Sequence, residues 1–96
     1  MRIRDVLWIE PFAEKNETRH GVSAEEVLEV FDRKPFITFR EAGHVRDEDV
    51  YSALGRTEDG RYLAVFFIHK HSDDALILSA RDQTATERRR YGKAKT

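Results

Sequence analysis

The sequence predicts an α+β domain, in which helices pack on a mostly antiparallel β-sheet. Three observations carry this prediction: a helix-capping pattern in the first third, four short apolar runs after it, and a helix-capping pattern near the end. The expected order of elements is β-α-α-β-β-β-β-α. The 96 residues suffice for one domain, so residues 1–96 are taken as a single unit whose last few residues are disordered.

The first elements are expected to be a short strand and a short helix. Val6-Leu7-Trp8-Ile9 is an apolar run typical of a strand. Pro11 suits the first position of a helix, because the N–H that proline lacks would be unpaired there. We expect this helix over residues 12–19, ended by Gly21, since glycine adopts the left-handed conformation that closes many helices.

A second helix is predicted to begin after Ser23. Ser23 and Glu26 have the spacing of a capping box, and Val22 and Val27 occupy the apolar positions that often flank such a cap. The helical period predicts an inner face made of Val27, Leu28 and Phe31, and an outer face of Glu25, Glu26 and Glu29.

The second half of the chain is expected to form the sheet. The four predicted strands are Phe36–Phe39, Val50–Arg56, Tyr62–Ile68 and Ala75–Ala80. Asp59-Gly60 is a strong hairpin signal, and residues 61–68 are apolar on both faces, which predicts a central strand covered on both sides. The segment Glu41–Asp49 is expected to be an exposed loop. Thr84 and Glu87 form a second capping box that opens a last, largely polar helix.

The composition excludes several classes of protein. There is no cysteine, which excludes disulfide frameworks, cysteine zinc sites, iron–sulfur clusters and thiol catalysis. No apolar run is long enough to span a membrane, and no signal peptide is visible, so a cytoplasmic domain is expected. Glycine-rich phosphate loops are absent, and we expect neither a cofactor nor a metal ion. In His69-Lys70-His71, a polar hairpin tip is favoured over a zinc site, since no further ligands are signalled.

The charge is distributed unevenly along the chain. The net charge is −1, but residues 81–96 hold six Lys or Arg against two Asp or Glu. The chain therefore combines a mildly acidic body with a basic C-terminal segment. Such a segment is suited to phosphate groups or to an acidic partner.

Four residues suggest phosphodiester chemistry. His20 lies at the end of the first predicted helix and can transfer protons near neutral pH, although histidine is also common as an ordinary helix cap. Arg56 and Arg81 end two predicted strands, where a guanidinium can bind phosphate or simply be solvated. Tyr91 lies in the basic helix, where it can stack on a base, donate a proton, or pack against the sheet.

Several motifs in order along the chain resemble one known family. They are Trp8-Ile9-Glu10-Pro11, Asn16-Glu17-Thr18-Arg19-His20-Gly21-Val22-Ser23, Glu29-Val30-Phe31-Asp32, Ala53-Leu54-Gly55-Arg56-Thr57 with Gly60-Arg61, Leu78-Ser79-Ala80-Arg81, and Glu87-Arg88-Arg89-Arg90-Tyr91. Together they resemble the BrnT family of bacterial toxins, small RelE-like ribonucleases paired with a DNA-binding antitoxin. Three places depart from the family pattern: Arg19 replaces a lysine, Val50 replaces a residue that is often basic, and His69-Lys70-His71 replaces a more usual polar run.

The resemblance implies a metal-independent endoribonuclease toxin of a type II toxin–antitoxin system. In this chemistry the RNA 2′-hydroxyl attacks the neighbouring phosphorus, which restricts the substrate to RNA. The implied catalytic residues are His20 for proton transfer, Arg56 and Arg81 for the phosphate, Tyr91 for stacking or proton donation, and Glu48 as a weaker candidate base. Arg19 and Arg88 would orient the RNA backbone.

The resemblance also implies a protein partner. This would be a small ribbon-helix-helix antitoxin, whose dimer can form a heterotetramer with two toxins. Its acidic residues would pair with the basic helix, above all with Arg89 and Arg90. Two other interpretations stay open: a non-catalytic protein that binds the antitoxin and helps repress the operon, and a small stand-alone RNA-binding or scaffolding domain.

Overall fold

The computed structural model describes residues 1–9 and 20–95. In this part of the chain the elements are β1 (Asp5–Trp8), α2 (Ala24–Asp32), β2 (Phe36–Glu41), β3 (Val50–Arg56), β4 (Tyr62–His69), β5 (Asp74–Asp82) and α3 (Ala85–Ala94). The helix predicted over residues 12–19, which includes Arg19, lies outside the described residues. Among the described helices, none has the length and apolar character needed to cross a membrane.

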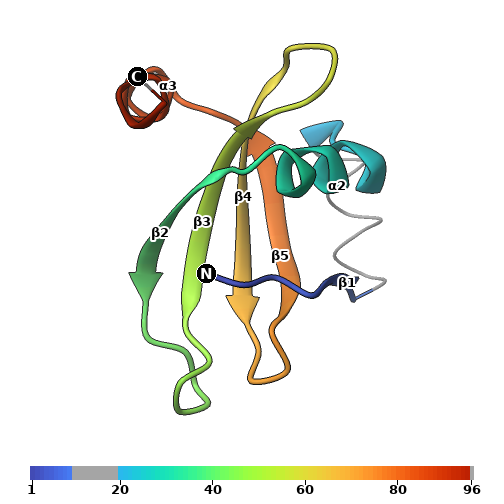
Figure 1. The fold of residues 1–96 in the computed structure, drawn as a ribbon, viewed down its shortest axis with the longest axis vertical. Coiled ribbons are helices and arrows are strands. Elements are labelled where there is room, and N and C mark those ends of the chain that lie inside the picture. Colours follow the sequence, from blue (N-terminus) through green and yellow to red (C-terminus); the bar gives the residue numbers. More distant parts are fainter. Residues whose placement is uncertain (10–19, 96) are drawn as a thin grey trace.

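The strands form one five-stranded sheet in the order β1-β5-β4-β3-β2 (Figure 1). Three neighbouring pairs are antiparallel, as the sequence predicts, whereas β1 pairs with β5 in parallel. The sheet is therefore mixed. The parallel pairing joins residues about 70 positions apart, such as Val6 and Ala75, and no local signal in the sequence specifies it.

The local signals for helix ends and turns are confirmed. The Ser23 side chain accepts a hydrogen bond from the backbone N–H of Glu26, and the Glu26 side chain accepts one from the N–H of Ser23. Thr84 and Glu87 form the same reciprocal pair at the start of α3. Gly60, in the β3–β4 turn, has a φ of +87°, a conformation that disfavours residues with a Cβ.

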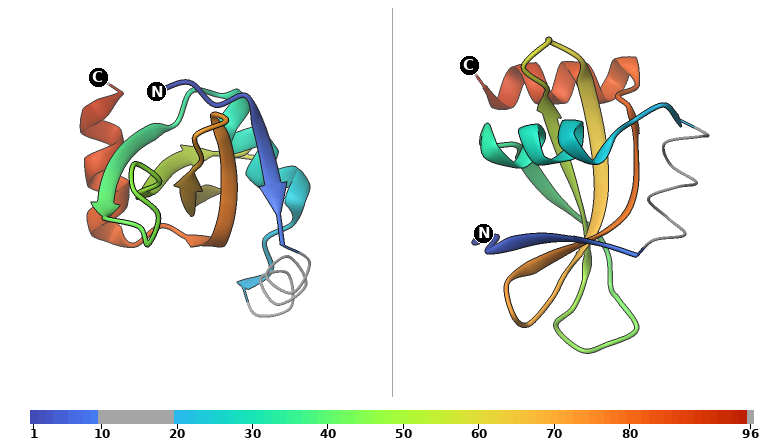
Figure 2. Two further views of the ribbon diagram at one scale, coloured as in Figure 1. Left: turned by 90° about the horizontal axis from the view of Figure 1, so that it is seen from below. Right: turned by 90° about the vertical axis from the view of Figure 1, so that its right-hand side faces the viewer.

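Helix α2 covers one face of the sheet and closes the core (Figure 2). Val22, Val27 and Val30 are buried against inward side chains of β4 such as Val65 and Phe67. The predicted inner face was wrong in one position: Leu28 is 44% exposed, and Val30 faces the core instead. Residues three apart, such as 27 and 30, share a helix face, whereas residue 28 is rotated by about 100° from residue 27.

The prediction that β4 is covered on both sides was correct only in part. β4 is central in the sheet, and Leu63, Val65 and Phe67 are fully buried under α2. On the other face Phe66 is half-buried, and its ring is approached by the guanidinium groups of Arg40 and Arg81. Helix α3 packs against β3 near the end of the sheet that carries Arg56 (Figure 1). This position of α3 creates the groove described next.

Candidate functional site

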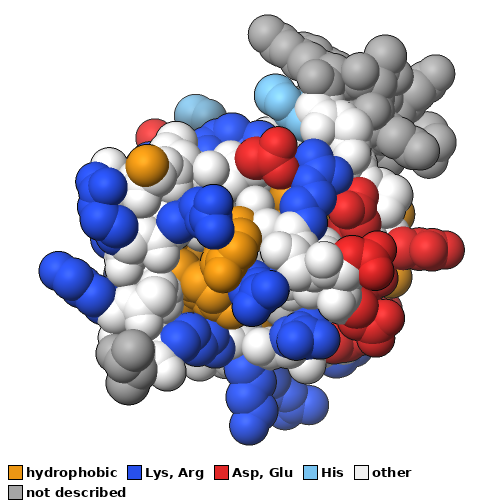
Figure 3. Space-filling model, turned by 90° about the horizontal axis from the view of Figure 1, so that it is seen from above, with side chains coloured by type: hydrophobic (Ala, Val, Ile, Leu, Met, Phe, Trp, Pro, Cys, Tyr) orange, Lys and Arg blue, Asp and Glu red, His pale blue; other side chains and the backbone are white. Residues whose placement is uncertain are grey.

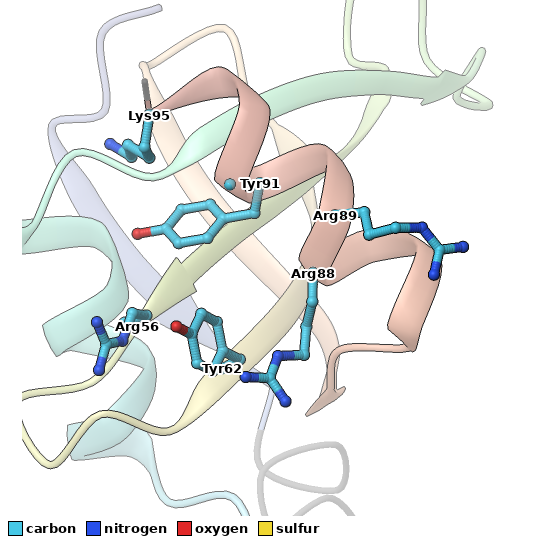
Figure 4. A pocket seen from close by; sticks show the side chains of 7 residues that line it. Arg56, Tyr62, Arg88, Arg89, Tyr91 and Lys95 are labelled. Atoms are coloured by element: carbon cyan, nitrogen blue, oxygen red, sulfur yellow. The ribbon is translucent and has the colours of Figure 1, made fainter.

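A groove of about 480 Å³ lies between α3 and the ends of β3 and β4 (Figure 4). Its lining residues are Arg56, Tyr62, Arg88, Arg89, Tyr91, Gly92 and Lys95. Arg56 is the last residue of β3 and Tyr62 the first of β4, so a tight hairpin brings them side by side. Helix α3 supplies the opposite wall through residues one turn apart.

In this groove, the ring of Tyr62 at the start of β4 stacks against two guanidinium groups. The Cζ atoms of Arg56 and Arg88 lie 4.8 and 4.1 Å from the ring centroid of Tyr62, so they are within about 9 Å of each other. Tyr91 meets the Tyr62 ring edge to face, with centroids 6.1 Å apart. Figure 4 shows Arg56 and Arg88 on either side of Tyr62. The Tyr62 ring lies between the two guanidiniums, so each can offer its N–H donors to an anion bound in the groove beside the ring.

The surface around the groove is basic. Seen from the end that carries α3, Lys and Arg side chains surround a hydrophobic patch (Figure 3). Neither Arg56 nor Arg88 forms an ion pair with a described carboxylate, and both are exposed. Arg89 and Arg90 are exposed on the same helix, and Arg89 donates a hydrogen bond to the Thr86 hydroxyl. The arrangement can bind an anion and offers tyrosine hydroxyls as proton donors.

His20 is not among the residues that line the groove. It is exposed, and its backbone carbonyl accepts a hydrogen bond from Arg61 Nη2 at 3.2 Å. Arg61 also donates to the carbonyl of Gly21 at 2.7 Å and forms ion pairs with Glu26 and Asp82. Arg61 thus fixes the backbone on which His20 is carried. Hydrogen bonding to Asp82 raises the pKa of Arg61 above its ordinary value, so the anchor stays charged.

Arg81, a predicted phosphate ligand, is paired with a carboxylate within the fold. Its two terminal nitrogens donate to the two carboxylate oxygens of Glu87 at 2.7 and 3.0 Å. This two-pronged pair lowers the pKa of Glu87 and raises that of Arg81. Since Glu87 also caps α3, the pair ties β5 to the start of the helix. Both terminal nitrogens of Arg81 are therefore occupied, and the side chain cannot make a two-pronged contact with a phosphate while this pair is intact.

Glu48 lies at the opposite end of the sheet from Arg56. It precedes β3, whereas Arg56 ends it, and the seven residues of that strand span about 20 Å. Its carboxylate accepts hydrogen bonds from Lys70 Nζ at 2.7 Å and from the backbone N–H of His71 at 3.0 Å. The hydrogen bond from Lys70 is the main reason that its pKa is lowered. The segment predicted to be an exposed loop therefore contains one buried, paired carboxylate, which is placed to join two loops rather than to act on a substrate at the groove.

The two histidines around Lys70 also contact backbone. His69 Nε2 lies 2.9 Å from the carbonyl of Arg2, and His71 Nε2 lies 2.7 Å from the carbonyl of Arg46. In the described residues, no group of three or more His, Cys, Asp or Glu is arranged to hold a metal ion.

The structure thus brings together Arg56, Arg88 and Tyr91 of the predicted site, and it leaves out His20, Arg81 and Glu48. Arg19 lies outside the described residues. Sequence reasoning missed Tyr62 and Lys95, which line the groove. A tyrosine that begins a strand carries no signal of its own, and only its pairing with the end of β3 places it beside Arg56.

Comparisons with known proteins agree with the fold. A solved structure of the Brucella abortus ribonuclease toxin BrnT superposes with a TM-score of 0.68 at 23% sequence identity, covering 83% of this chain and 96% of that one. No curated protein sequence matches the chain significantly. The sequence model of a family described as "Ribonuclease toxin, BrnT, of type II toxin-antitoxin system" matches residues 8–87. The chain therefore belongs to the BrnT family of type II toxin–antitoxin ribonuclease toxins.

Proposed function

We propose that this protein is an endoribonuclease that cleaves RNA without a metal ion, and that the scissile phosphate binds in the groove beside Arg56 and Arg88. The observation that supports this most directly is the pair of guanidiniums stacked on Tyr62 with no described carboxylate to neutralise them. Two fixed positive groups stabilise the charge that develops when a fifth oxygen attacks phosphorus. Tyr62 would act through them, as a positioning residue.

The proposed reaction is an internal transesterification. The ribose 2′-oxygen forms a bond to phosphorus, the bond from phosphorus to the 5′-oxygen breaks, and a 2′,3′-cyclic phosphate remains. One proton leaves the 2′-hydroxyl, and one reaches the departing 5′-oxygen. Tyr91, whose side chain lines the groove, is the proposed donor of the second proton. The part of His20 in proton transfer stays a prediction from the sequence.

The test is 5′-end mapping of cellular RNA after brief induced expression. Wild type should produce new cuts, and Arg56→Gln should remove most of them. The His20→Ala variant tests the role of His20. Cutting equal to that of wild type would exclude His20 from proton transfer, and a loss of cutting would place it in the reaction. Purified protein that cuts RNA equally well in the presence of EDTA would support metal independence, and a loss on chelation would overturn it.

One observation favours a second candidate, a non-catalytic protein that binds its antitoxin. Arg81, one of the two predicted phosphate ligands, is already paired with Glu87. In this case the exposed Arg89 and Arg90 would receive the acidic residues of a ribbon-helix-helix antitoxin, in a heterotetramer of two toxins with an antitoxin dimer. Folded wild-type protein that binds the antitoxin and produces no new RNA ends would establish this candidate over the enzyme.

A further inference from the structure

A second hollow of about 520 Å³ continues the groove towards the end of α2. It is lined by Asp32, Arg33, Lys34, Arg56, Tyr91 and Lys95. Three of these residues, Arg56, Tyr91 and Lys95, also line the first hollow. The two hollows therefore share a wall and form one continuous depression, which runs from the middle of α3 to the C-terminal end of α2.

The charges of the second hollow are unbalanced. Arg33, Lys34, Arg56 and Lys95 face one acid, Asp32, and none of the four forms an ion pair with a described carboxylate. Cations that the fold leaves unneutralised in a concave surface attract anions strongly. Arg56 was a candidate phosphate ligand from the sequence, whereas Arg33, Lys34 and Lys95 were not singled out there.

The backbone of this hollow is held by contacts between the two helices. Lys34 has a φ of +52°, which places it in the left-handed conformation just after α2. Its carbonyl accepts a hydrogen bond from the ammonium group of Lys95, at the end of α3. This hydrogen bond links the end of α2 to the end of α3. It therefore holds the cationic residues at the two helix ends close together.

We propose that this second hollow binds the RNA phosphate next to the one that Arg56 and Arg88 hold in the groove. The substrate would be an unpaired RNA strand, since the groove combines a cationic track with two half-buried tyrosine rings in its lining. The inference rests on the proposed function and adds to it a second subsite. Arg33 and Lys34 bind substrate in this assignment and take no part in bond breaking.

The test is salt-dependent binding of a labelled RNA oligonucleotide carrying 2′-O-methyl groups at every position, which cannot undergo the cleavage. Arg33→Gln with Lys34→Asn removes two cations, and asparagine tolerates the left-handed backbone. Each lost phosphate contact lowers the salt slope by about 0.7, so between 50 and 200 mM salt the wild type should lose about sevenfold more affinity than the variant. Arg46→Gln, which removes a cation from the loop before β3 at the opposite end of the sheet, should behave as wild type.

Measuring the cleavage of unmodified RNA distinguishes a failure of the proposed subsite from a failure of the proposed function. The variant should show a raised KM and an unchanged kcat, since binding beside the reaction affects both states alike. Wild-type cleavage with an unchanged KM and salt slope in the variant would overturn the subsite and leave the function standing. Absence of both binding and cleavage in wild type would overturn both. A variant that loses only antitoxin affinity would assign the surface to the antitoxin instead.

Folding of the variant is checked by its thermal unfolding. If the double variant does not fold, Arg33→Gln alone carries the same test, and the difference in salt sensitivity should be about two- to threefold over the same range. No difference from wild type in this single variant would also overturn the subsite.

Discussion

The two ends of the sheet differ in the partners of their cationic side chains. At the end formed by the turns before β3 and after β4, Glu48 is paired with Lys70, and Asp74 is paired with Arg4. At the other end, Arg61 and Arg81 are also paired with carboxylates, whereas Arg56 and Arg88 stack on Tyr62 and form no ion pair with a described carboxylate. Ion pairs within the fold hold loops together, and cations stacked on a ring remain available to a ligand. The contrast teaches that the partner of an arginine, and not its presence, indicates its role.

The largest effect should come from removing an arginine that has no carboxylate partner. Arg56→Gln should slow RNA cleavage about 10²- to 10³-fold, the usual consequence of losing one donor to a developing negative charge. Its thermal unfolding should change little, because no described ion pair is lost. The measurement is the single-turnover rate on a defined RNA. Full activity in this variant would remove the groove from the reaction.

A somewhat smaller effect is expected on antitoxin binding. Charge reversal of Arg89 and Arg90 to glutamate should weaken the complex about tenfold at low salt and less at high salt, because exposed charges are screened. Affinity titrations over a range of salt concentrations measure this. A loss of affinity that does not vary with salt would contradict the electrostatic account of the interface.

Arg81 and Glu87 provide a matched pair of variants for a charge that is already paired. Arg81→Gln and Glu87→Gln should each lower stability by about 1 kcal/mol or less, because solvent screens the pair. Both should leave cleavage within a few-fold of wild type. Glutamine at position 87 can still cap α3, so the second variant tests the pair alone. If Arg81→Gln abolished cleavage while Glu87→Gln did not, Arg81 would act on the substrate, as the sequence suggests.

The smallest predicted effect is on stability. It concerns Glu48, at the end of the sheet far from the groove, and it depends on pH. Lys70 lowers the pKa of Glu48 in the folded chain, so this carboxylate adds stability at pH values above its unfolded pKa of 4.5. That contribution should be lost as the pH falls below 4.5 and through the lowered folded value. Thermal unfolding of wild type and Glu48→Gln should therefore differ at pH 7 and converge in acid. RNA cleavage by Glu48→Gln at pH 7 should equal that of wild type, and a large loss there would restore Glu48 as a candidate base.

Motifs and ion pairs differ in how far they can be predicted from the sequence. The family motifs pointed to Arg56, Arg81 and Glu48 without showing which of them meet. The structure separates them through contacts across long stretches of chain: Glu48 reaches Lys70, and Arg61 reaches Glu26. Arg61 belonged to a motif, yet its function as an anchor for the backbone of His20 and Gly21 appears only when β4 is placed beside them.

The sequence by itself determined the features that depend on neighbouring residues. The two capping boxes, the turn at Gly60 and the four strands of the second half follow from contacts three or four residues apart and from side-chain alternation. The tertiary structure alone decided the parallel pairing of β1, the position of α3 over β3, and the division of arginines into paired and unpaired ones. Electrostatic partners are chosen by distance in space, and in this chain that distance is set by the register of strands far apart in sequence.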